Sequence, residues 1–245
     1  MPGILSTVVD AFAASGVDLA ALGLAWARVM PTVAIVPAFG LRALPLPARG
    51  VLGLALAASI FPALAVPGLA SSSQLPWALL AIGEIVRGLP IALAAAIPLW
   101  AATMAGGLVD ALRGATDMTS APTVEGRATP LGVPLSLLAC AIFLGTGGPS
   151  RVVAALALRE VGAHPLLAAA NDIVGGIGLA VALGGPLLAA AVVIEIAAAL
   201  VARAAAPAQI HALLAPLRAL GILGVMAIVL ERLAAAMTLA IARAP

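Results

Sequence analysis

The chain contains no lysine and no tyrosine, and it has few charged residues of any kind. Only 9% of its 245 residues are charged and 3% are aromatic, and all 12 basic side chains are arginines. A phosphate-binding loop of the ATPase type and Schiff-base catalysis both require lysine. Nucleic-acid-binding proteins use clustered basic and aromatic side chains, whereas the arginines here are scattered along the sequence. These absences exclude both enzyme classes, and we expect no nucleic-acid partner.

Side chains that bind metals are equally scarce. Cys140 is the single cysteine, so no disulfide can form within the chain. Its neighbours in the sequence are apolar, which favours a buried and unreactive thiol. His164 and His211 each lack a second histidine or cysteine at ligand spacing, and a metal site needs ligands that converge. We therefore expect no metal and no other cofactor.

Signals for catalysis and for signal-peptide cleavage are also missing. No serine has a histidine and an acid at hand to form a catalytic triad. The segment GTGGPSR at residues 145–151 lacks the lysine of a phosphate loop and follows an apolar helix pattern, which indicates a helix-breaking turn. The first residues carry no arginine, so they do not resemble a cleaved signal peptide. The sequence predicts a protein that is not an enzyme and that inserts without cleavage.

Apolar residues dominate what is present. They make up 64% of the chain, and the mean hydropathy is +1.22. Soluble domains have about 25% charged residues, so this chain cannot cover a water-facing surface and needs lipid or partner proteins around it. Bilayer-spanning helices need about 20 mostly apolar residues. No polar block between the apolar stretches is long enough to fold alone. Six stretches meet the length criterion: 19–41, 50–69, 75–108, 131–158, 172–206 and 213–241.

The pattern within these stretches predicts an all-α, polytopic membrane-type protein made of kinked helical hairpins, with residues 1–245 as one unit. Several stretches exceed a simple bilayer crossing, so they tilt, break or hold paired helices. Proline removes a backbone donor and kinks a helix. We expect breaks at residues 145–149 and 184–186. We expect kinks at the prolines inside the apolar stretches, Pro31, Pro37, Pro62, Pro90 and Pro98.

Ionisable residues inside the stretches are costly and need partners, by about 2.5–3.5 kcal/mol at a span centre. Glu84 and Arg87 are three residues apart, so they share a helix face and can neutralise each other. An ion or proton path and pairing between helices or subunits are the alternatives. Arg28 and Arg203 have no nearby partner in the sequence, which favours interhelical or intersubunit pairing. Glu195 completes this set of buried or intersubunit ionic residues.

The most informative segment lies at residues 105–148, AGGLVDALRGATDMTSAPTVEGRATPLGVPLSLLACAIFLGTGG. Its ordered pattern, D-x-x-RGAT, then P-x-x-EGRATPLG, then an apolar run that ends in F-x-x-x-GG, resembles the central segment of the FliR/SctT family. Segments 27–56 and 84–114 resemble the family's first hairpin and its next helix. Segment 202–218 departs from the family pattern around Pro207 and Gln209. The charged D-x-x-RG motif resembles the injectisome branch of the family more than the flagellar branch.

The resemblance implies a non-enzymatic subunit of the type III secretion export gate in the bacterial inner membrane. It implies SctR-like and SctS-like partner subunits, together with the large export-gate and switch proteins of the same system. Together the gate subunits form a helical assembly through which unfolded protein substrates pass, much of it raised above the membrane plane. A subunit of a small-molecule transporter, with Glu84 and Arg87 in the substrate path, is the rival interpretation. No internal repeat, which many transporters have, supports that rival.

The resemblance further implies that the central loop, residues 113–130, projects into the channel as a plug. A loop punctuated by glycine and proline can move without melting the flanking helices, and its polar side chains can face a wet lumen. The alternative is that this segment is a simple connection between helices. The residues assigned to the plug loop and its start are Asp110, Arg113, Gly114, Thr116, Asp117, Pro122, Glu125, Gly126 and Arg127.

Overall fold

The computed structural model describes residues 14, 18–39, 45–64, 75–114, 119–120, 127–158, 164–205 and 211–244. Long helices dominate this part of the chain, which confirms the all-α prediction. Two short strands of two residues each, β1 (Thr119–Ser120) and β2 (Arg127–Ala128), pair antiparallel inside the central loop, where no strand was expected. The helices are α2 (Leu19–Ile35), α3 (Leu46–Leu64), α5 (Trp77–Leu112), α6 (Gly132–Gly145), α7 (Gly148–Ala157), α8 (Pro165–Ala204) and α9 (His211–Arg243).

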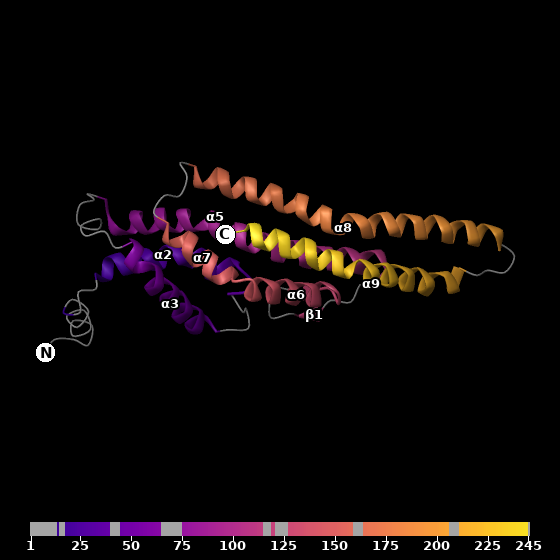
Figure 1. Ribbon diagram of the computed structural model, residues 1–245, viewed down its shortest axis with the longest axis horizontal. Coiled ribbons are helices and arrows are strands. Elements are labelled where there is room, and N and C mark those ends of the chain that lie inside the picture. The colour runs from indigo at the N-terminus through magenta and orange to yellow at the C-terminus, as the bar shows by residue number, and fades with distance from the viewer. Residues whose placement is uncertain are drawn as a thin grey trace.

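Helix α5 is the axis of an elongated structure (Figure 1). The chain runs along α5, returns along α6 and α7, runs forward again along α8 and returns along α9. Helices α2, α6, α8 and α9 all pack against α5, while α3 packs against α2 and α7. The hairpin of α8 and α9 extends beyond the end of α5 in the direction away from α2 and α3 (Figure 1).

Small residues on α5 allow its neighbours to approach closely. Closely packed helices in lipid rely on such residues because there is no water-driven force to hold them together. The core combines this small-residue face with larger side chains from the surrounding helices. Phe39 and Phe143 meet edge to face, with ring centroids 5.9 Å apart. The buried alanines of α5 are Ala92, Ala95, Ala96, Ala101, Ala102 and Ala105.

The longest helices exceed a bilayer crossing, as predicted. With 36 residues in α5 and 40 in α8, a rise of 1.5 Å per residue gives lengths of about 54 and 60 Å. The hydrocarbon core of a bilayer is about 30 Å thick. In the described part of the chain, four helices are long and apolar enough to span a membrane, and α6 with α7 forms a fifth candidate.

The two predicted helix breaks have different outcomes. The break after residue 145 is confirmed: α6 and α7 are bent by 65° at a turn where Gly147 adopts φ 74°. The predicted break at residues 184–186 is wrong, since α8 is continuous through Pro186. Gly184 serves packing instead, because a Cβ there would lie 2.5 Å from Leu108 Cδ2 of α5.

Proline is accommodated within several helices. Pro31, Pro62, Pro90 and Pro98 lie inside α2, α3 and α5, which continue through them. Pro37 lies outside, just after α2 ends at Ile35. The kink angles at these prolines therefore stay a prediction.

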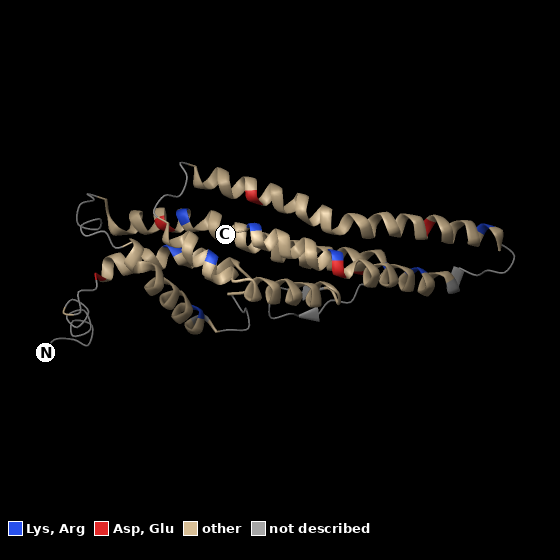
Figure 2. Ribbon diagram, viewed as in Figure 1, with Lys and Arg blue, Asp and Glu red and all other residues tan. Residues whose placement is uncertain are grey.

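Large apolar side chains remain exposed along the outer helices, and charged residues are sparse (Figure 2). Contiguous apolar surface of this extent marks contact with lipid or other proteins. Helix α8 carries the longest series, which includes Ile173, Val174, Ile177, Val181, Val192, Val193 and Ile196.

The crossing of α2 and α5 provides a test of this packing. At Gly88 an added Cβ would overlap the carbonyl oxygen of Arg28, whereas at Gly83, five residues earlier, it would meet nothing within 4 Å. Gly88→Ala should force the helices apart and destabilise the protein by about 1–3 kcal/mol. Gly83→Ala should be neutral or stabilising by up to about 1 kcal/mol.

The measurement is the thermal midpoint, followed by tryptophan fluorescence, of the protein purified in detergent together with any subunits that it needs to stay folded. Equal midpoints for the two variants would contradict the close crossing of α2 and α5.

Candidate functional site

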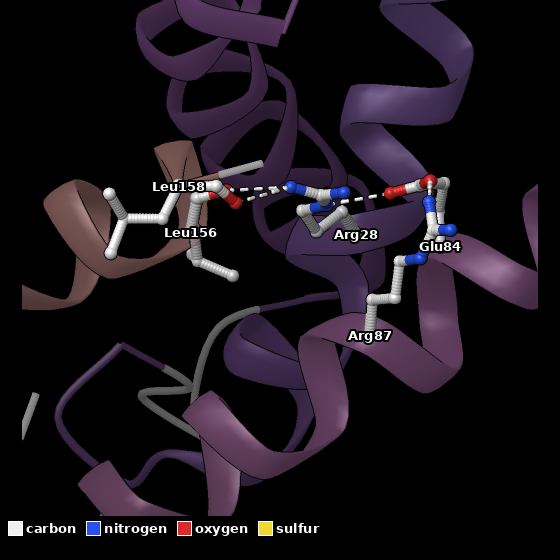
Figure 3. A network of polar contacts seen from close by, with 5 residues as sticks. All are labelled: Arg28, Glu84, Arg87, Leu156 and Leu158. Carbon is white, nitrogen blue, oxygen red and sulfur yellow. Dashed lines mark hydrogen bonds and ion pairs between the residues drawn. The ribbon is translucent and has the colours of Figure 1, made fainter. Parts of the chain in front are cut away.

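A network of polar contacts joins α2, α5 and the end of α7 (Figure 3). Arg28 Nε donates to Glu84 Oε2 over 2.6 Å, and Arg87 Nη1 donates to Glu84 Oε1. Arg28 Nη1 also donates to the carbonyl oxygens of Leu156 and Leu158, at 3.1 and 3.0 Å. The last carbonyls of a helix lack intrahelical donors, so Arg28 satisfies the C-terminus of α7 while pairing with α5.

Arg28 and Arg87 differ in how deeply their side chains are buried, which indicates different roles. The Arg28 side chain is 3% exposed, that of Glu84 14%, and that of Arg87 52%. The planar guanidinium of arginine can hold several acceptors at once, which suits the buried position. Arg28 therefore has the distant interhelical partner that its isolation in the sequence suggested. The predicted Glu84–Arg87 contact also forms, but at the exposed edge of the network.

The contacts of the network indicate that its side chains hold helices together. Both Glu84 oxygens accept a hydrogen bond from an arginine. An open groove of about 390 Å³ between α2 and α3 is lined by apolar and glycine residues, and neither Glu84 nor Arg87 lines it. The lining residues are Leu19, Leu22, Gly23, Trp26, Gly50 and Leu54.

A second arrangement lies at the base of the central loop, where α5 ends and α6 begins. Asp110, in the last turn of α5, is 0% exposed. Its Oδ1 accepts from Arg113 Nε and Nη2, each at 2.7 Å, and its Oδ2 accepts the backbone N–H of Leu131 at 2.6 Å. One buried carboxylate thus holds the chain on both sides of the loop.

The remaining residues assigned to the loop are described only in part. Gly114 follows α5 with φ 74°, and Arg127 lies in β2, paired with Ser120 through the backbone. Asp110 belongs to α5 and not to the loop itself. Thr116, Asp117, Pro122, Glu125 and Gly126 lie outside the described residues.

The ionic residues of the C-terminal hairpin form a weaker contact. Glu195 of α8 pairs with Arg218 of α9 at 3.2 Å, with side chains 54% and 33% exposed. Arg203 is exposed near the end of α8. Sequence reasoning missed Arg218 because its partner lies on another helix, and Arg218 itself stands in an otherwise apolar run.

Sequence reasoning also missed Arg151. Its Nη1 donates to Thr146 O at the bend, and its Nη2 donates to Ile241 O near the end of α9, at 3.2 and 2.9 Å. The available signal was an arginine placed just after a predicted break, next to carbonyls that the break leaves without donors.

Among the described residues, no group of three or more histidine, cysteine, aspartate or glutamate side chains could hold a metal ion.

The Arg28–Glu84 pair predicts an order of mutational effects. Glu84→Gln leaves the buried Arg28 without its carboxylate, which should cost about 3–5 kcal/mol. Arg87→Gln removes an exposed partner and should cost about 1 kcal/mol or less. Glu84→Gln combined with Arg87→Gln should be as unstable as Glu84→Gln alone, because Arg28 is still unpaired.

The measurements that test this order are the amount of protein in the membrane fraction and the thermal midpoint of the protein purified with any subunits that it needs to stay folded. Recovery of near wild-type stability in the double variant would show that Glu84 and Arg87 form an isolated pair.

Comparisons with known proteins identify sequence relatives of the chain. A 73-residue stretch is 42% identical to the secretion system apparatus protein SsaT of Salmonella typhimurium strain LT2, and it covers 29% of this chain and 28% of that relative. The family model described as bacterial export proteins, family 1, matches residues 19–244, from the first residue of α2 to the end of α9. Since that match includes nearly the whole chain, the protein belongs to the bacterial export proteins of family 1, the FliR/SctT family.

Proposed function

We propose that this protein is a non-enzymatic subunit of the export gate of a type III secretion system, of the injectisome branch, in the bacterial inner membrane. The observation that carries the proposal is the family match over residues 19–244. The partial similarity to a secretion system apparatus protein supports a role in secretion, and the D-x-x-RG motif of the central segment favours the injectisome branch. In this role the chain forms, with SctR-like and SctS-like subunits, a channel for unfolded protein substrates.

The surface of the structure supports assembly with other subunits. Helix α8 is about 60 Å long and exposes large apolar side chains along its length. A bilayer core of about 30 Å covers about half of such a helix. Neighbouring subunits would cover the remainder, and the same system's large export-gate and switch proteins are further partners in this proposal.

The central loop, residues 113–130, is the proposed plug of the resting channel. The support is that the segment connects two helix ends, those of α5 and α6, which Asp110 holds together. A segment anchored at both ends can occupy a lumen without carrying the flanking helices with it. The rival function, small-molecule transport through Glu84 and Arg87, has less support because these side chains bind each other and Arg28.

Partner dependence tests the gate assignment. We expect the protein made alone to aggregate or be degraded, because its exposed apolar faces have no cover. Co-expression with SctR-like and SctS-like subunits should raise the yield of soluble, monodisperse complex in detergent several-fold. A monodisperse, stable monomer with no gain from the partners would favour a transporter that acts alone.

Loop shortening tests the plug. Removing residues between Gly114 and Gly126 should leave assembly intact, since α5 and α6 are unchanged, and should raise ion leakage because the constriction loses bulk. A matched control replaces the same residues with a glycine–serine segment of equal length, which keeps the backbone and removes the side chains.

The measurement is membrane conductance, or sensitivity to small dyes, in cells that make the variant with its partners. Normal assembly with no added leak would identify the segment as a simple connection.

A further inference from the structure

The junction of α5 and α6 is held by a clasp of described residues, Asp110, Arg113 and Leu131. The clasp uses both oxygens of one fully buried carboxylate. Oδ1 accepts two donors from Arg113, on the chain before the loop, and Oδ2 accepts the Leu131 N–H, on the chain after it. Residues 18 positions apart are thereby bound to the same side chain.

Backbone packing around the clasp is equally close. A Cβ at Gly106 would lie 2.6 Å from Leu131 O and 2.7 Å from Gly132 Cα, so α5 and the start of α6 touch through their main chains. The Gly132 N–H donates to Thr129 Oγ1 at 3.2 Å. The loop ends are therefore joined by the bond from the Leu131 N–H to Asp110 and by backbone contact, while the ion pair with Arg113 holds the Asp110 carboxylate in place at the end of α5.

We propose that this clasp stays closed while protein passes through the gate, and that Asp110 is the positioning residue that fixes the separation of the loop ends. Opening the clasp would separate the buried carboxylate from the Leu131 N–H, in an environment that cannot replace that donor with water. Helices α5 and α6 then keep their positions relative to each other during export. The proposal rests on the proposed function only in taking the segment between the clasped ends as the plug.

An engineered disulfide across the clasp tests this directly. A Cβ at Gly107 would lie 3.7 Å from Thr129 Oγ1 and 4.0 Å from Thr129 Cγ2, which is within reach of a disulfide between cysteines at these positions. The variant carries Gly107→Cys and Thr129→Cys together with Cys140→Ala, which removes the native thiol. It is made with its partner subunits, and each single-cysteine variant serves as a control.

Oxidation should form the cross-link readily in the resting gate. The oxidised protein should then export substrate at the rate of the same protein after reduction. Loss of export on oxidation, restored by reduction, would overturn the proposal, because the clasp would then have to open. Failure of the cysteines to cross-link would also overturn it, because the loop ends would not be held together at rest.

The rate at which the same disulfide forms also tests the role of Asp110. Asp110→Asn keeps the size of the side chain but leaves one acceptor oxygen, which cannot serve both Arg113 and the Leu131 N–H, so the bond across the loop should weaken and cross-linking should slow several-fold. Resting ion leakage should rise with it. Asp172→Asn, which removes a carboxylate from α8, is the matched control for loss of charge.

An unchanged cross-linking rate in Asp110→Asn would show that Asp110 does not set the position of the loop ends. The cross-link and the leak of the shortened loop are independent readouts. A shortened loop that does not leak would contradict the plug, while the cross-linking results would still decide whether the clasp stays closed.

Discussion

A guanidinium group that is 3% exposed must have its charge compensated inside the protein. For Arg28 that compensation comes from Glu84 of α5, and its Nη1 donates to two carbonyl oxygens at the end of α7. The constraint determines the arrangement of three helices at once, because each supplies a group that the others cannot replace. The backbone contact between Gly88 and Arg28 acts at the same place, so electrostatics and packing fix one crossing of α2 and α5.

The same combination recurs further along α5. At Gly106 and Asp110, a close backbone approach again accompanies a buried, fully bonded charge. Buried ionic groups are weak sources of stability, since their desolvation offsets the attraction. They do penalise every alternative arrangement that leaves a charge unpaired. In an apolar chain whose helix faces are otherwise alike, two such points on one helix can determine which neighbour packs where.

The sequence was sufficient for the helices but not for their pairing. Hydropathy predicted the apolar stretches, and the glycine and proline after Leu144 predicted the bend. Local spacing predicted the Glu84–Arg87 contact. The partner of Arg28 lies 56 positions away, and which acid it meets depends on the rotation of α2 against α5. An alanine- and leucine-rich pattern encodes that rotation weakly, because many rotations bury similar apolar surface.

The error at residues 184–186 has a related cause. Glycine and proline together indicate a break when only the local chain is considered, yet α8 continues because Gly184 lets the helix lie against Leu108. The helix gains tertiary packing that exceeds the cost of one missing backbone hydrogen bond at Pro186. A continuous α8 is about 60 Å long, twice the bilayer core, and its exposed apolar residues continue along both halves. A bilayer core covers about half of such a surface, so the length of α8 fits the proposed assembly with other subunits.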